Sequence, residues 1–296
     1  MKKTALVTGG TRGLGLVAAR KLAERGFDLF ITARQAADGD RAAAELRGRV
    51  PGASVEVLPL DLTAFASIRD CAARFLATGR PLHALVQNAG LMTQDRTVRL
   101  TSEGFELTLG TNHVGHFLLC HLLLPVVRRS APARIVVVAS QMHRAGVGQG
   151  PGPDFDYANL RGERSFDPVV AYRNSKLANL WFTFELARRL EGTGVTVNAV
   201  CPGFVPATIA DRMPGLLRRL VFRYVLPRMK FARTPEQGGE NTARTAADPA
   251  LEGVTGKFFT DLKEAEASDD ARDPAQAARL WAETCRWCGI EKFGEP

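Results

Sequence analysis

The feature that most constrains this chain is a regular alternation of short apolar runs with longer helical patterns over most of its 296 residues. Seven strands are expected, at residues 4–7, 28–32, 54–59, 82–86, 134–140, 195–200 and 256–260. Buried runs separated by helices of this length are typical of a mostly parallel sheet with helices on both faces. Right-handed crossovers then predict a doubly wound α/β fold with strand order 3-2-1-4-5-6-7. Because no repeat or linker divides the sequence, we expect a single domain over residues 1–296.

The loop after the first expected strand is rich in glycine, and residues 8–15 read TGGTRGLG. A strand, a glycine-rich turn and a helix together aim a helix N-terminus at a phosphate group. No lysine follows Gly15, which argues against a P-loop, and the spacing differs from the G-x-G-x-x-G dinucleotide fingerprint. A tight turn without a ligand is the alternative. We expect the loop to contact a dinucleotide through Gly9, Thr11, Arg12, Gly13, Leu14 and Gly15.

The residues that end the second expected strand indicate which dinucleotide binds. In dinucleotide-binding folds an acidic residue about 20 positions past the glycines binds the ribose 2′-hydroxyl of NAD. Here that position holds Ala33, and Arg34 follows it. A guanidinium attracts a 2′-phosphate, which a carboxylate would repel, and Arg12 adds a second cation within the glycine loop. We therefore predict NADP as the cofactor.

Two further turns follow the third and fourth expected strands, at the carboxyl edge of the sheet. Asp61 and Leu62 would lie beside strand two and suit an adenine edge, although Asp-Leu-Thr is also a good helix N-cap. Asn88, Ala89 and Gly90 form a turn of small residues that would let the backbone approach a ribose. Because ligands of open α/β sheets bind at this edge, both turns are candidate cofactor contacts.

Tyr172 and Lys176 lie four residues apart near the start of an expected helix, so they share one face. An ammonium close to a phenol lowers the pKa of the phenol from its ordinary value of about 10. Such a pair suits general acid–base chemistry on a carbonyl or alcohol oxygen. Ser140 ends the fifth expected strand and is placed to hydrogen-bond the same oxygen. The four-residue spacing of Tyr172 and Lys176 is stronger evidence for a catalytic site because the glycine loop occurs in the same chain.

Six stretches occur in the order that is typical of one enzyme family: TGGTRGLG, QNAG, TNHVGHFLL, IVVVAS, AYRNSKLAN and CPGFV. Over about residues 4–263 the chain therefore resembles the short-chain dehydrogenase/reductase family. Within that family it is similar to the branch of retinol dehydrogenases, WW-domain oxidoreductases and protochlorophyllide reductases. The resemblance implies a Rossmann-type sheet and hydride transfer between NAD(P)H and a carbonyl.

The resemblance also implies roles for individual residues. Tyr172 would be the acid/base, and Lys176 would bind the nicotinamide ribose and tune the tyrosine. Ser140 would orient the substrate oxygen, and Asn112 would kink its helix and hold a water linked to Lys176. Four residues would lie near the nicotinamide carboxamide, namely Pro202, Gly203, Val205 and the capping Thr208. The chain departs from the usual pattern at Gln87, at Cys201 and in the spacing of Thr208.

Residues 204–234 combine apolar side chains with arginines and follow the sixth expected strand. The resemblance implies that such a segment covers the substrate, so we expect a lid over an apolar pocket and a hydrophobic aldehyde, ketone or alcohol as substrate. A helix packed on the core, a membrane-surface helix and a dimer contact are the alternatives. Two other functions stay open: C=C reduction by the same tyrosine and lysine, and a catalytically silent NADP-binding sensor or scaffold.

Composition narrows the partners and the compartment. The net charge is +8, but the arginines are scattered without interleaved aromatics, so we expect no nucleic acid partner. Five widely spaced cysteines, no leader and no apolar stretch long enough to span a bilayer predict a cytoplasmic protein with no integral membrane segment. His113 and His116 lack a third ligand at suitable spacing, so no metal is expected. The apolar pattern of the two long helices fits a homodimer and a monomer equally.

Overall fold

The computed structural model describes residues 2–148, 150–210 and 215–295. Its sheet has eight strands in the order β3-β2-β1-β4-β5-β6-β7-β8, which confirms the order expected for the first seven. Neighbouring strands run parallel except for β7 and β8, which are antiparallel. The strands are β1 (Thr4–Val7), β2 (Asp28–Ala33), β3 (Val55–Pro59), β4 (Ala84–Gln87), β5 (Ala133–Val138), β6 (Val195–Cys201), β7 (Lys257–Thr260) and β8 (Lys263–Ala265).

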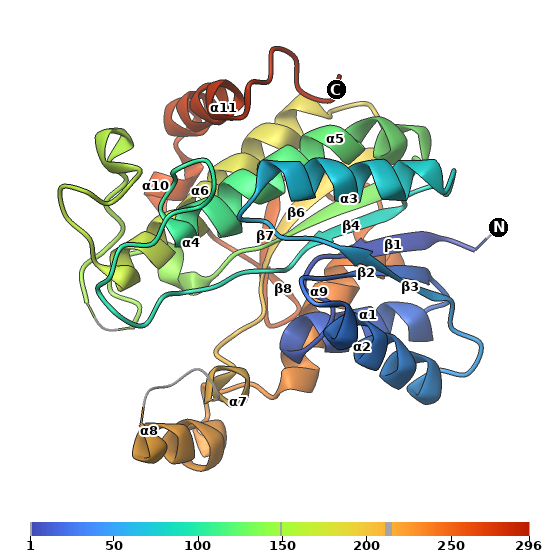
Figure 1. Ribbon diagram of the computed structural model, residues 1–296, viewed down its shortest axis with the longest axis horizontal. Helices are drawn as coiled ribbons and strands as arrows, with labels where there is room; N and C mark the ends of the chain where they lie inside the picture. The colour runs from blue at the N-terminus through green and yellow to red at the C-terminus, as the bar shows by residue number, and fades with distance from the viewer. Residues whose placement is uncertain (1, 149, 211–214, 296) are drawn as a thin grey trace.

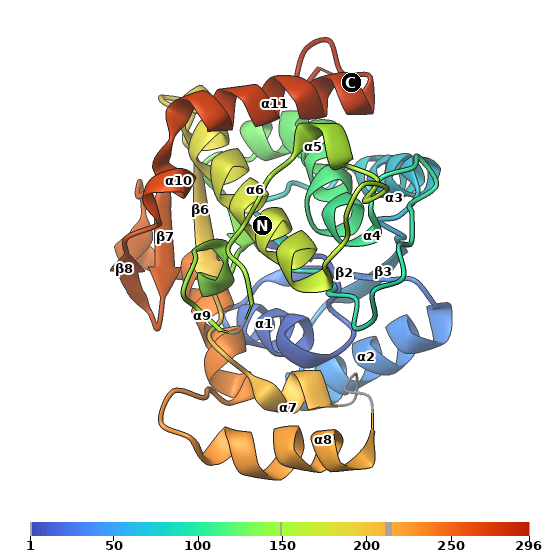
Figure 2. The same cartoon turned by 90° about the vertical axis from the view of Figure 1, so that its left-hand side faces the viewer.

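Helices cover both faces of the sheet (Figure 1). On one face α3 (Phe65–Ala77), α5 (Gly115–Arg129) and α6 (Pro168–Arg189) bury their apolar sides in the larger core. On the other face α1 (Gly13–Glu24), α2 (Ala36–Arg49) and α9 (Pro235–Ala247) do the same in the smaller core. The other helices are α4 (Leu107–Leu109), α7 (Pro206–Ile209), α8 (Leu216–Leu220), α10 (Asp269–Arg272) and α11 (Pro274–Cys288), and α11 packs against α6 (Figure 2).

Shorter helical segments fill several connections between these elements. Two are π-helical, η1 (Gly110–Val114) and η5 (Val221–Val225). Four are 3-10 helices: η2 (Gln141–His143), η3 (Tyr157–Asn159), η6 (Leu226–Arg228) and η7 (Pro249–Leu251). The segment η1 joins α4 directly to α5, and η5 continues α8, so each pair forms one longer helical stretch.

A strong local signal determines where α6 begins. The Asp167 carboxylate accepts hydrogen bonds from the N–H groups of Val169 (2.8 Å) and Val170 (3.2 Å). Pro168 occupies the first helical position, where its missing N–H group is not needed. This cap sets the start of the helix and therefore places Tyr172 in its second turn.

Three details differ from the sequence-based expectation. The sheet has eight strands rather than seven, because the chain reverses after β7 with positive φ at Asp261 (49°) and Leu262 (64°). That turn lacks the Asn-Gly or Asp-Gly signal on which hairpin prediction depends. Pro125 within the helical pattern of residues 103–128 predicts an interruption, but the long helix continues through it, and the hydrogen-bond pattern changes instead in η1. The sequence pattern predicts that residues 41–48 belong to a helix, and α2 contains them but begins earlier, at Ala36.

Candidate active site

The glycine loop connects β1 to α1 and exposes the start of that helix. Gly9 and Gly13 have φ of +65° and +55°, which residues with a side chain rarely adopt. A Cβ on Gly15 would lie 2.2 Å from the Gly9 carbonyl oxygen, so no side chain fits there. Arg12 is the N-cap residue of α1, and a guanidinium has no acceptor with which to cap the first N–H groups. The loop therefore presents a helix N-terminus that suits a phosphate.

The turn after β4 lies directly against this loop. The Thr8 hydroxyl oxygen accepts hydrogen bonds from the backbone N–H groups of Asn88 (2.9 Å) and Ala89 (3.0 Å). The Asn88 side chain in turn donates to the Thr8 carbonyl oxygen at 2.9 Å. A Cβ on Gly9 would lie 3.1 Å from the Ala89 Cβ. Two predicted cofactor segments are thus in contact, and Thr8, which sequence reasoning missed, holds them together.

The Asn112 side chain connects Leu91, which follows that turn, to helix α6 by hydrogen bonds. It lies in η1, so the helix is irregular at this residue, as the resemblance implies. Its Oδ1 accepts from the Leu91 N–H at 2.8 Å, and its Nδ2 donates to the Leu91 carbonyl oxygen (2.8 Å) and to Ser175 Oγ (3.0 Å). A Cβ on Gly90 would lie 3.1 Å from Asn112 Oδ1 and 3.8 Å from Lys176 Nζ. The turn therefore connects the glycine loop to the lysine.

The Tyr172 and Lys176 side chains do share one face of α6. Lys176 Nζ lies 5.5 Å from the centre of the Tyr172 ring. The lysine is buried and donates a hydrogen bond to the Val138 carbonyl oxygen at the end of β5, at 2.8 Å. Burial lowers the pKa of Lys176 to about 8, because the ammonium loses its hydration. Tyr172 is half-buried.

Ser140 follows β5 and is held by the short helix η2. Its hydroxyl oxygen accepts from the Met142 N–H at 3.1 Å, and η2 packs against α6, the helix of Tyr172. The Ser140 carbonyl oxygen accepts from His143 Nδ1 at 2.6 Å, while His143 Nε2 accepts from the Ser268 N–H at 3.1 Å. His143 is therefore neutral, and it connects the strand end to the C-terminal part of the chain.

Two residues beside Tyr172 hold the long loop that follows Ser140, and sequence reasoning assigned neither of them. Arg173 is fully buried. Its guanidinium donates to three carbonyl oxygens of the loop, those of Met142 (3.3 Å), Arg144 (2.9 Å) and Val147 (2.7 Å). Asn174 exchanges two hydrogen bonds with the backbone of Asp154, at 2.8 Å and 2.6 Å. Helix α6, which carries Tyr172, therefore also provides the side chains that hold the neighbouring loop.

His116, for which the sequence predicts no metal-binding role, joins two parts of the site. His116 Nδ1 donates to the Asn112 carbonyl oxygen at 3.1 Å, so Nε2 accepts from the Thr8 hydroxyl at 2.9 Å. Burial lowers the pKa of His116 to about 4, which keeps the ring neutral. The contact with Asn112 follows from four-residue spacing on a helix, whereas Thr8 is 108 residues away and gives no local signal.

The residues predicted for the adenosine side lie at the end of β2 and after β3. Arg12 and Arg34 are both exposed, and no hydrogen bond or ion pair to another described residue occupies either side chain. Asp61 Oδ1 accepts from the N–H (2.9 Å) and the hydroxyl (2.7 Å) of Thr63, so it makes a local turn, but the N-cap residue of α3 is Ala64 and not Asp61. The Leu62 side chain is buried. An adenine contact by Asp61 and Leu62 stays a prediction.

The chain after β6 returns to the glycine loop. A Cβ on Gly238 of α9 would lie within 3.1 Å of the Leu14 side chain, the Pro202 carbonyl oxygen and the Val205 side chain, so these three converge. Gly203 has φ of +88°, and the Arg233 side chain lies across it. The predicted carboxamide segment therefore adjoins the first turn of α1.

Thr208 reaches the glycine loop despite its unusual spacing in the sequence. Its Cγ2 would lie 3.7 Å from a Cβ on Gly13. Its hydroxyl donates to the Val205 carbonyl oxygen at 2.9 Å, within α7. Thr11, which lies between Gly9 and Gly13 in the loop, is half-buried. Thr208 thus lies near Gly13, as Pro202 and Val205 lie near Leu14, and the contacts of these residues with a cofactor stay predictions.

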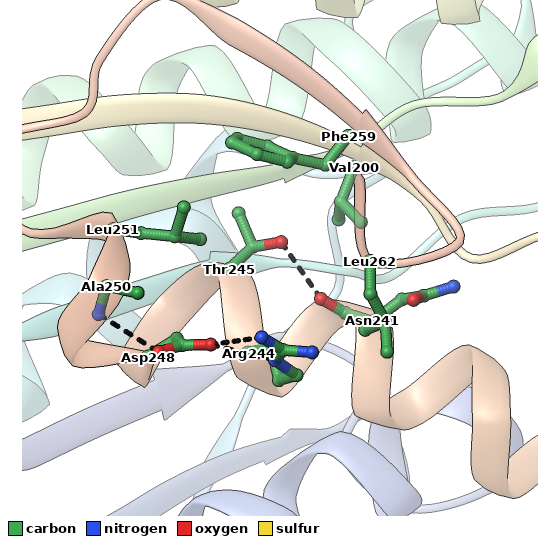
Figure 3. A pocket seen from close by; sticks show the side chains of 9 residues that line it. All are labelled: Val200, Asn241, Arg244, Thr245, Asp248, Ala250, Leu251, Phe259 and Leu262. Carbon is green, nitrogen blue, oxygen red and sulfur yellow. Dashed lines mark hydrogen bonds and ion pairs between the residues drawn. The ribbon is translucent and has the colours of Figure 1, made fainter. Parts of the chain in front are cut away.

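The small hollow drawn in Figure 3 lies elsewhere, beside α9 and β7. Its polar groups satisfy one another: Arg244 pairs with Asp248 at 2.6 Å, Asp248 accepts from the Ala250 N–H at 3.0 Å, and Thr245 donates to the Asn241 carbonyl oxygen at 2.9 Å. Among the described residues that line it, none is a predicted site residue. We therefore place the candidate site at the glycine loop and not in this hollow.

A doubly wound sheet, a glycine loop at its carboxyl edge and a tyrosine–lysine pair on one helix define the short-chain dehydrogenase class of oxidoreductases. The sequence profile of the family described as short chain dehydrogenase matches residues 3–152, and the chain belongs to this family. It is 40% identical to retinol dehydrogenase 12 of Mus musculus over 289 residues, which cover 98% of this chain and 87% of that protein.

Two further relatives agree with this assignment. Polyprenol dehydrogenase of Mus musculus is 39% identical, with 97% of this chain and 84% of that protein covered. Among solved structures, the RhlG/NADP active-site complex of Pseudomonas aeruginosa has a TM-score of 0.65 and 26% identity, and the match covers 87% of this chain and 94% of that one. Both the sequence and the fold thus resemble oxidoreductases of this family.

Proposed function

We propose that this protein is an NADP(H)-dependent oxidoreductase of apolar aldehydes, ketones or alcohols. It transfers a hydride between the nicotinamide and the carbonyl carbon of the aldehyde or ketone, which is the hydroxyl-bearing carbon of the alcohol. The observation that carries the proposal is the Lys176 ammonium, buried 5.5 Å from the Tyr172 ring and next to the turn that contacts the glycine loop. A buried cation is costly, and titratable groups with a strongly shifted pKa cluster at functional sites.

The residues present fit a phosphate-bearing dinucleotide. The uncapped start of α1 suits the pyrophosphate, and the exposed Arg12 and Arg34 suit a further phosphate on the adenosine side. Among the described residues, Val138 uses one of the three ammonium donors of Lys176, so donors are left for ribose hydroxyls. When bound, NADP(H) supplies the hydride donor or acceptor.

The side chains then supply the proton and the electrostatic support. In the direction of reduction, the Tyr172 hydroxyl donates its proton to the substrate oxygen while the carbonyl carbon receives a hydride, so the product is an alcohol. The Ser140 hydroxyl donates a hydrogen bond to the same oxygen and stabilises its developing negative charge. The Lys176 ammonium stabilises the tyrosinate that is left, until it regains a proton from solvent. Alcohol oxidation follows the same steps in reverse.

Two observations support an apolar substrate. The relatives are named for retinol and polyprenol, which are alcohols with long apolar chains. In residues 204–234, the segment that we expect to cover the substrate, the Phe204 ring contacts the rings of Phe222 and Phe231. We therefore place the substrate among apolar carbonyl compounds and the corresponding alcohols rather than among sugars.

The test is a Tyr172→Phe variant assayed for NADPH consumption across apolar aldehydes, ketones and quinones. We expect turnover to fall by at least roughly 100-fold, because the general acid is lost, while the thermal shift caused by NADPH stays that of the wild type. Tyr157→Phe is the matched control. The Tyr157 hydroxyl is buried without a hydrogen-bond partner in the described structure, so its removal should leave turnover unchanged.

Three results would contradict the proposal. Unchanged turnover by Tyr172→Phe would exclude this tyrosine as the acid. A wild-type protein that binds NADPH without consuming it on any substrate would favour a sensor or scaffold. Products with a reduced C=C bond and an intact carbonyl, identified by mass and NMR, would favour the alternative double-bond reductase.

A further inference from the structure

The segment 215–233, here called the projection, exposes an unusual amount of apolar surface. Of the ten large apolar side chains that are exposed among the described residues, seven lie in it: Leu216, Leu217, Leu220, Tyr224, Val225, Met229 and Phe231. Leu216 and Leu217 are 74% and 76% exposed. Exposed apolar side chains gathered at one place mark an interaction site, whereas scattered single ones are ordinary.

The projection is anchored at its base and extends away from the body. Phe204 and Ala232 form a β-bridge, and the Arg233 N–H donates to the Phe204 carbonyl oxygen at 2.8 Å. The Arg233 guanidinium pairs with both oxygens of Asp261, at 2.6 Å and 2.8 Å. Beyond this base, α8 lies outside the helical layers that cover the sheet, and both views show it there (Figures 1 and 2). The leucines therefore face solvent although the segment itself is held.

The charge of the projection indicates what covers it. Between Gly215 and Thr234 the sequence has six cationic residues and no carboxylate. They are Arg218, Arg219, Arg223, Arg228, Lys230 and Arg233. Arg233 pairs with Asp261 outside the segment, and two copies joined through the projection would still bring the other cations of both segments together, with no acid in the segment to offset them. A partner surface that accepts apolar side chains and carries negative charge therefore fits the projection better than a second copy does.

We propose that the projection binds the surface of an anionic lipid bilayer. Its leucines and aromatics would enter the boundary between headgroups and acyl chains, while its arginines and lysine would pair with lipid phosphates. The chain would lie on the bilayer rather than cross it, since no described helix is both long and apolar enough to span a membrane. This inference does not depend on the reaction that the protein catalyses.

The test is co-sedimentation of the full chain with phosphatidylcholine vesicles, with and without phosphatidylglycerol. We expect binding to the anionic vesicles that weakens as salt is raised. Leu216→Gln/Leu217→Gln and Arg218→Gln/Arg219→Gln should each lower the affinity by roughly tenfold or more. NADPH-induced thermal shifts of all variants report whether they are folded.

Matched controls come from elsewhere in the chain. Leu76→Gln removes an exposed leucine from α3, and Arg128→Gln/Arg129→Gln removes an adjacent exposed pair from the end of α5. Both should bind vesicles like the wild type. The proposal fails if the wild type does not bind anionic vesicles, or if the controls lose as much affinity as the projection variants. It also fails if light scattering shows a dimer that the leucine variant dissociates, because a second copy would then be the occupant.

Discussion

Ala33 stands where dinucleotide-binding folds that prefer NAD carry an acid, and Arg34 follows it. Ala33, the last residue of β2, is buried, and a Cβ on Gly39 of α2 would lie 3.2 Å from the Ala33 Cβ. A carboxylate at Ala33 would therefore be crowded and desolvated. Arg34, one residue on, is exposed at the edge where the glycine loop begins its helix. At the scale of single residues, the proposed preference for NADP thus depends on two cations and a missing acid.

Substituting Arg12 or Arg34 should weaken the binding of NADPH more than the binding of NADH. We expect Arg34→Gln and Arg12→Gln each to raise the Kd for NADPH by about tenfold, because a charge-assisted hydrogen bond contributes about 1.5–3 kcal/mol. The Kd for NADH should change by less than about threefold, since it has no 2′-phosphate to lose. Titration of cofactor fluorescence measures both constants.

Arg41→Gln is the control for these variants, because it removes an exposed arginine of α2 that pairs with Asp38. An equal loss of NADH and NADPH affinity in Arg34→Gln would show that the arginine acts on the loop and does not recognise the 2′-phosphate.

At the scale of elements, α6 carries the tyrosine–lysine pair and also holds a neighbouring loop, whereas the sequence pattern indicates only the pair. The Tyr172 and Lys176 side chains lie on one face of the helix, and the residues between them make other contacts. Arg173 holds the loop after Ser140, and Ser175 connects Asn112 to the Tyr172 carbonyl oxygen through hydrogen bonds of 3.0 Å and 2.7 Å. The position of the proposed catalytic pair and the shape of the neighbouring loop are therefore coupled through one helix.

Replacing Arg173 with methionine should test this coupling. Three carbonyl oxygens of the loop would lose a charged donor, so we expect faster hydrogen exchange over residues 141–148. We also expect kcat/KM for the best substrate to fall at least roughly tenfold, because small misplacements of reacting groups are costly. NADPH affinity should change little.

Arg164→Met, an exposed arginine of the same long loop, is the matched control and should behave like the wild type. If Arg173→Met leaves hydrogen exchange of the loop unchanged, Arg173 does not hold it.

At the scale of the whole molecule, three neutral imidazoles join distant parts of the chain. His116 connects η1 and α5 to β1, His143 connects the end of β5 to Ser268, and His113 lies 3.2 Å from Thr284 of α11. Burial lowers the pKa of His113 to about 3 and those of His116 and His143 to about 4. Each imidazole is therefore neutral in the folded protein over a pH range in which an unfolded histidine is protonated.

This difference predicts acid sensitivity. Unfolded histidine has a pKa of about 6.5, so unfolding takes up protons below that pH. The free energy of unfolding should be highest above about pH 6.5 and fall toward about pH 4, by at most about 1.4 kcal/mol per pH unit for each histidine. Urea unfolding at a series of pH values measures the slope, and His143→Gln should reduce it by about one proton. A slope of zero between pH 6.5 and 4 would contradict the prediction.

Local patterns in the sequence were sufficient for the alternation of strands and helices, the order of the first seven strands, the glycine loop and the four-residue spacing of Tyr172 and Lys176. Each of these depends on residues within one turn, strand or crossover, where backbone geometry and burial follow directly from neighbouring side chains.

The tertiary structure alone decided the contacts between residues far apart in the chain. They include the hydrogen bond from Thr8 to His116, the hold of Arg173 on the loop after Ser140, and the exposure of Leu216 and Leu217. It also added β8 and continued the long helix through Pro125. The physical reason is that a buried polar group takes whichever partner the packed fold brings near, and a helical apolar stripe looks the same in sequence whether a core, a membrane or water covers it.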